Sequence, residues 1–101
     1  MPVLVVNINP NPGQLETVEA VFLEFVGRVH EEDGCELYAL NRGKYRLILI
    51  EKWRDMESLK VHGAGTNLKE LHEKLDGLLA SELDIQILRP VPSGDETKGA
   101  L

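Results

Sequence analysis

Cysteine, aromatic residues and clustered basic residues are all scarce in this chain of 101 residues. The single cysteine, Cys35, excludes an intrachain disulfide and any metal site built from several thiolates. Acidic side chains outnumber basic ones by 17 to 11, and the lysines and arginines are scattered along the chain. We therefore expect neither nucleic acid nor a membrane surface as a partner, and a reducing, cytoplasmic location fits the cysteine content.

Long hydrophobic runs are missing as well. No apolar stretch reaches the ~18 residues that a membrane-spanning helix requires. The segment from Met1 to Val6 is apolar, but it is short and lacks a basic leader, which predicts a strand rather than a signal peptide. With 43% hydrophobic residues, the chain is expected to be a soluble protein with one core.

The patterns that are present alternate between strand-like and helical periods. Two helix starts are indicated, with Asp55 and Thr66 as the expected N-caps. The helix that follows Thr66 is expected to carry leucines as far as Leu79 on one face. The predicted order is a strand over 3–9, a helix over 14–32, a hairpin of strands over 35–40 and 45–53, a short helix, a longer helix, and a strand over 83–91.

This order predicts an α+β, ferredoxin-like fold in which a four-stranded antiparallel sheet carries helices on one face. In the third strand, Leu47 and Leu49 point to one side while Ile48 and Ile50 point to the other. Helices on one face can cover only one of these pairs. We therefore expect a homodimer that buries the second face. Residues 1–91 are expected to form the domain, and residues 92–101 a mobile tail or an arm that crosses to the partner.

Glu51 and Trp53 are the most informative pair in the chain. They lie two residues apart on a strand that should be buried, so they point to the same face. A carboxylate in that place is costly unless it is paired, so Glu51 either lines a pocket or meets a basic residue across a dimer interface. Trp53 is either a core aromatic residue or a ring on which a ligand stacks.

Two histidines are the candidate catalytic residues. His62 follows Leu59 by three positions and His72 follows Leu68 by four, so both lie on or beside apolar helix faces. A neutral histidine facing a pocket can accept a phenolic proton near neutral pH. The alternative is that each is a hydrogen-bonded residue at the edge of the core.

Three further residues are candidates for the pocket wall. Tyr38 and Asn67 offer a hydroxyl and an amide to a bound ligand. Asn7 interrupts an otherwise apolar first strand, where it either presents its amide to the pocket or marks the fraying end of the strand. No metal site is expected from the sequence.

Several short motifs together resemble the antibiotic biosynthesis monooxygenase domain, and they span nearly the whole chain. They are, in order, Pro12-Gly13 after the first strand, Glu31-Glu32-Asp33-Gly34-Cys35 with Tyr38, Glu51-Lys52-Trp53, and His62-Gly63-Ala64-Gly65. The resemblance implies a dimeric α+β barrel. Members of that family include small oxygenases that attack quinols or polycyclic phenols without metal, flavin or haem.

The resemblance also sets limits on which activity carries over. Haem-degrading members use an asparagine, a tryptophan and a histidine where this chain has Val6, His62 and His72, so only the histidine matches. Polyketide-oxidising members have an asparagine and a tyrosine where this chain has Leu49 and Leu59, so only Trp53 matches.

Two functions follow from these observations. The first is a cofactor-independent monooxygenase that oxidises a quinol-like or polyphenolic small molecule with dioxygen. The alternative is a non-catalytic dimeric module that binds an apolar or aromatic small molecule or acts in a stress response, and haem degradation ranks third.

Overall fold

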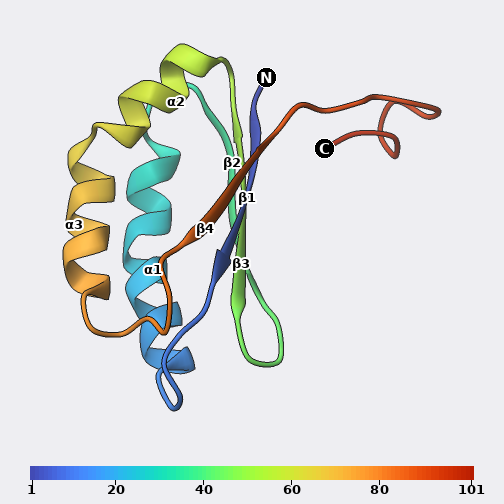
Figure 1. Ribbon diagram of the computed structural model, residues 1–101. Coiled ribbons are helices and arrows are strands. Elements are labelled where there is room, and N and C mark those ends of the chain that lie inside the picture. Colours follow the sequence, from blue (N-terminus) through green and yellow to red (C-terminus); the bar gives the residue numbers. More distant parts are fainter.

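A four-stranded antiparallel sheet carries three helices on one face, and the C-terminal segment lies on the other side (Figure 1). The structure is a computed structural model that describes residues 1–101. The strand order is β2-β3-β1-β4. The strands are β1 (Val3–Ile8), β2 (Cys35–Arg42), β3 (Leu47–Trp53) and β4 (Asp84–Leu88), and the helices are α1 (Leu15–His30), α2 (Met56–Gly63) and α3 (Thr66–Leu75). The predicted ferredoxin-like α+β fold is confirmed.

Helix ends differ from the predictions where local chemistry decides them. The side chain of Asp55 caps α2 as expected, since its Oδ1 accepts the Ser58 N–H at 2.8 Å. Thr66, in contrast, is already the first residue of α3, and the N-cap position is held by Gly65 without a side-chain bond. The helix ends at Leu75 instead of continuing to Leu79, because Gly77 takes a φ of +78° and turns the chain.

The core lies between the sheet and the helices. Alternate residues of β3 point toward the helices and are almost fully buried: Leu47, Leu49, Glu51 and Trp53. The residues between them, Ile48 and Ile50, lie half-buried on the opposite face, where no helix covers them. The strand therefore has one covered and one uncovered apolar face, as its sequence predicts.

Residues 92–101 contain no helix or strand. Their end returns toward the sheet, where Lys52 Nζ donates a hydrogen bond to the Leu101 carbonyl oxygen at 3.0 Å. None of the three helices is both long and apolar enough to cross a membrane.

Candidate active site

An apolar cavity of about 190 Å³ lies between the inner face of the sheet and the helices. Eleven of its fifteen lining residues are hydrophobic, among them Tyr38, and the polar chemistry comes from Glu51, His62 and His72. Strand β3 supplies Glu51, α2 supplies His62 and α3 supplies His72. Four of the seven candidates from the sequence therefore meet at one cavity.

Glu51 is a carboxyl group set into an otherwise apolar wall. Its residue is 4% exposed, and its Oε1 accepts a hydrogen bond from Trp53 Nε1 at 2.9 Å. Burial raises the pKa of Glu51, while the Trp53 hydrogen bond and the nearby His62 oppose that rise. The indole thus supplies the partner that a buried carboxyl group needs, from within the same strand.

His62 lies between two carboxyl groups from different elements. Its Nδ1 is 2.9 Å from Glu32 Oε1, and its Nε2 is 3.8 Å from Glu51 Oε1. Only the first distance is a hydrogen bond, so Nε2 remains available on the side of the cavity. The imidazole is therefore placed to exchange a proton with a group bound beside Glu51.

Aromatic rings fix the plane of this imidazole. The Trp53 ring lies 4.4 Å from the His62 ring, centroid to centroid, at 30°, and the Tyr38 ring meets it edge-on at 6.0 Å. Trp53 is fully buried and supports His62 and Glu51 without lining the cavity itself. Burial raises the pKa of Tyr38, so its phenol stays protonated and acts as a hydrogen-bond donor rather than a base.

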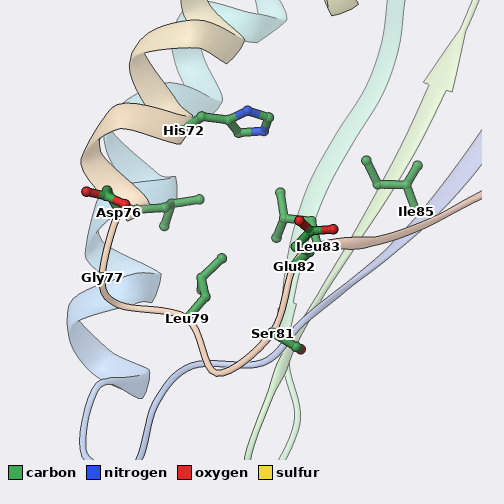
Figure 2. A pocket seen from close by; sticks show the side chains of 9 residues that line it. His72, Asp76, Gly77, Leu79, Ser81, Glu82, Leu83 and Ile85 are labelled. Atoms are coloured by element: carbon green, nitrogen blue, oxygen red, sulfur yellow. The ribbon is translucent and has the colours of Figure 1, made fainter.

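His72 lies where this cavity meets a second, larger hollow of about 570 Å³ (Figure 2). The two share His72, Leu83 and Ile85 as lining residues. In Figure 2 the imidazole points from α3 across the hollow toward the sheet, whereas the Asp76 carboxylate points away from it. The inner cavity thus continues past His72 into a wider outer space.

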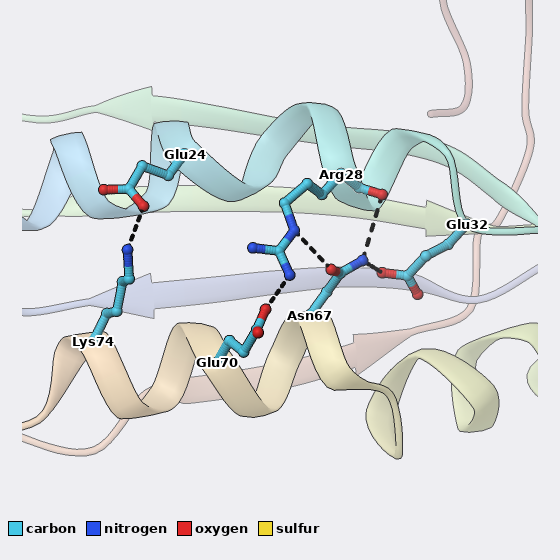
Figure 3. A network of polar contacts seen from close by, with 6 residues as sticks. All are labelled: Glu24, Arg28, Glu32, Asn67, Glu70 and Lys74. Atoms are coloured by element: carbon cyan, nitrogen blue, oxygen red, sulfur yellow. Dashed lines mark hydrogen bonds and ion pairs between the residues drawn. The ribbon is translucent and has the colours of Figure 1, made fainter.

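The two asparagine candidates lie elsewhere. Asn67 stands where α1 and α3 meet; its Nδ2 donates to Glu32 Oε2 at 3.0 Å and its Oδ1 accepts from Arg28 Nε at 3.0 Å (Figure 3). Asn7 lies on the uncovered face of the sheet, because its neighbours Val6 and Ile8 point inward and are buried. Neither amide lines the cavity.

Glu32 is the site residue that sequence reasoning misses. It lies in the turn after α1, outside any periodic pattern, and appears in the sequence only as one member of an acidic run. Nothing in that run distinguishes it from Glu31 or Asp33. Its contact with His62 joins positions 30 residues apart, and only the fold shows it.

Comparison with known proteins assigns the family. A family model described as antibiotic biosynthesis monooxygenase matches residues 1–74. The chain belongs to the antibiotic biosynthesis monooxygenase family. The predicted resemblance is thereby confirmed, and family membership supports a monooxygenase-like role.

Solved structures agree with this family assignment. A Pseudomonas aeruginosa protein is 25% identical with a TM-score of 0.81, over 89% of this chain and 93% of its own. A Mycobacterium tuberculosis protein is 22% identical with a TM-score of 0.83, over 94% and 100%. A structure described as an antibiotic biosynthesis monooxygenase is 20% identical with a TM-score of 0.82, over 91% and 100%. No protein with a curated description matches the chain.

Proposed function

We propose that this family member is a monooxygenase that oxidises an electron-rich phenol or quinol with dioxygen and needs no cofactor. The observation that carries the proposal is the base facing an apolar cavity: His62, held by Glu32, presents Nε2 beside Glu51. A phenol removed from water there can lose its proton only to a group of the wall. His62 and His72 are the proposed proton acceptors.

The chemistry balances without an added reductant. The phenol O–H gives its proton to the imidazole, and the phenolate gives one electron to dioxygen, which forms a ring radical and superoxide. These two combine at a ring carbon ortho or para to the oxygen and give a hydroperoxide. Loss of the hydrogen on that carbon, with cleavage of the O–O bond, leaves a quinone carbonyl and one molecule of water.

The cavity size suggests the part of the substrate that reacts. A volume of about 190 Å³ compares with the ~150 Å³ apolar cavity that binds benzene in another protein. One aromatic ring therefore fits beside Glu51 and His62. Further rings or substituents would extend past His72 into the outer hollow, which shares three lining residues with the cavity.

The decisive experiment measures oxygen uptake with a panel of one-ring and two-ring phenols and quinols, together with incorporation of ¹⁸O from labelled dioxygen. We expect turnover that chelators do not affect and that the double variant His62→Ala, His72→Ala loses by about 10²-fold or more. Glu24→Gln, on the outer side of α1, serves as the control and should turn over normally. No turnover with any compound of the panel would contradict the proposal.

Binding without catalysis is the second candidate function, and the apolar lining of the cavity supports it equally. Trp53 is the only tryptophan and its ring packs on His62, so its fluorescence reports on a ligand beside that residue. Saturable quenching by an aromatic compound without oxygen uptake would favour the binding module. The cavity gives haem degradation no comparable support, because it has room for one ring rather than a porphyrin.

We further propose that a second copy of the chain covers the outer face of the sheet. Val5, Ala39 and Ile50 are neighbours in register there, and no helix lies over them. Residues 1–91 would form the domain of each copy, and residues 92–101 a tail or an arm that reaches the partner.

A further inference from the structure

We propose that Glu32, together with Asn67 and Arg28, sets the tautomer of His62 so that its unprotonated Nε2 faces the cavity. This role rests on the proposed function, because it concerns the base that the reaction uses. Glu32 touches neither the cavity nor a ligand within it, so it acts as a positioning residue through His62.

The direction of the hydrogen-bond chain follows from Arg28, which can only donate. Its Nε–H points to Asn67 Oδ1 at 3.0 Å, which identifies that atom as the amide oxygen. The other end of the amide is then the NH₂ group, and it donates to Glu32 Oε2 at 3.0 Å. Arg28 is itself held by an ion pair with Glu70 on α3 (Figure 3).

Glu32 passes this direction on to the imidazole. With Oε2 occupied by Asn67, Oε1 accepts from His62 at 2.9 Å, so the proton of a neutral imidazole lies on Nδ1. The lone pair then lies on Nε2, the nitrogen nearer to Glu51. The same carboxylate stabilises the imidazolium that forms when Nε2 takes a proton.

Glu32 also offers this proton a way out of the core. Its side chain is 21% exposed, whereas those of His62 and Glu51 are 5% and 6% exposed. A proton taken up at Nε2 can be balanced by release of the Nδ1 proton to Glu32 and from there to water. The three groups thus connect the cavity to solvent where α1 meets α3.

The test uses Glu32→Gln, because Asn67 dictates how the new amide must turn. The Asn67 NH₂ group requires an oxygen opposite it, so glutamine turns its own NH₂ group toward His62 Nδ1. Nδ1 must then accept, and the imidazole proton moves to Nε2. This substitution preserves shape and inverts the tautomer.

The readout is the ¹⁵N spectrum of the His62 ring at a pH at which it is neutral, without substrate, assigned by the signals that His62→Gln lacks. We expect the Nδ1–H tautomer in the wild type and the Nε2–H tautomer in Glu32→Gln. In the double variant Glu32→Gln, Asn67→Ala the glutamine is free to turn, so part of the Nδ1–H form should return. Glu24→Gln removes an α1–α3 ion pair with Lys74 that does not reach His62, and should give the wild-type spectrum (Figure 3).

An Nε2–H tautomer in the wild type, or no change in Glu32→Gln, would overturn the inference. The wild-type spectrum decides the matter even if the variant does not fold. If the tautomers are as expected but no phenol supports oxygen uptake, the proposed function fails while the role of Glu32 stands. If uptake occurs, Glu32→Gln should reduce it by at least about tenfold, as expected for a misdirected base.

Discussion

The pairing of Glu51 with Trp53 shows how a short stretch of strand can keep a carboxyl group in an apolar wall. The two side chains share one face because strand residues alternate, and the indole N–H then reaches the carboxyl oxygen at 2.9 Å. Leaving that carboxyl group without a partner would cost about 1–3 kcal/mol. The pair therefore stabilises the inner face of the sheet and keeps a titratable group beside His62.

Glu51 should make stability depend on pH in the direction opposite to that of a salt-bridged carboxylate. Because burial raises its pKa, the folded protein holds this proton more tightly than the unfolded chain. Its contribution is most favourable below the unfolded pKa of about 4.3 and is lost as pH rises through the raised pKa. Glu51→Gln should therefore gain stability relative to the wild type as pH increases from about 4 to about 8.

Urea denaturation at several pH values measures this difference directly. Each unit by which folding raises the pKa corresponds to about 1.4 kcal/mol in the relative free energy of unfolding. Glu24→Gln, an exposed site, should show no such rise with pH. A flat difference for Glu51→Gln would mean that folding leaves this carboxyl group as acidic as in the unfolded chain.

Gly34 is the glycine with the strictest steric requirement. Its φ is +86°, and a Cβ atom there would overlap the Ser58 hydroxyl group. Gly34→Ala should therefore cost more than the ~1–2 kcal/mol of the left-handed backbone alone. Gly27 provides the matched case, because it is exposed within α1 and a Cβ would meet nothing within 4 Å.

Gly27→Ala should stabilise the protein by up to ~1 kcal/mol. Thermal unfolding of the two variants checks both signs. Similar melting temperatures for both would show that the contact with Ser58 relaxes at little cost.

Residue-scale prediction from the sequence succeeds where a periodic element carries the residue. Alternation along β3 places Glu51 beside Trp53, and helical spacing places His62 on the inner face of α2. Glu32 and Asn67 escape such reasoning because their contact is made between a turn and a distant helix. The position of Asn7 on the outer face follows from alternation with Val6 and Ile8.

Among the elements, the N-termini of the last two helices differ in how they are capped. Asp55 Oδ1 accepts the Ser58 N–H, whereas no side chain caps α3. Asp55→Ala should cost ~1 kcal/mol of stability, and Thr66→Ala less than ~0.5 kcal/mol. Chemical denaturation of both variants measures the contrast, and equal losses would contradict this assignment of the caps.

The sequence predicts the kind and order of the elements better than their ends. Apolar periodicity identifies every helix and strand, because each buries one face against the same core. Their ends depend on single residues such as Gly77, whose left-handed conformation stops α3 four residues before Leu79. Those choices are made by local contacts that no period records.

For the whole molecule, the open face of the sheet leads to a prediction of oligomeric state. Ile50 is half-buried there, between Val5 and Ala39 on the neighbouring strands. We expect the wild type to sediment as a dimer and Ile50→Arg as a monomer, because an arginine would have to be buried without a partner. Leu23→Arg, at a site 58% exposed on α1, should remain dimeric. A monomeric wild type would remove the basis of the proposed dimer.

The wall of the cavity is weakest along β4. This edge strand has only β1 as a partner, and all five of its residues are exposed, yet Ile85 and Ile87 bound the cavity. Its backbone hydrogen bonds should therefore open more often than those of the central strands. We expect the amides of β4 to exchange with deuterium fastest within the sheet, and an aromatic molecule held in the cavity to slow them. The strand that confines a ligand would then also be its door.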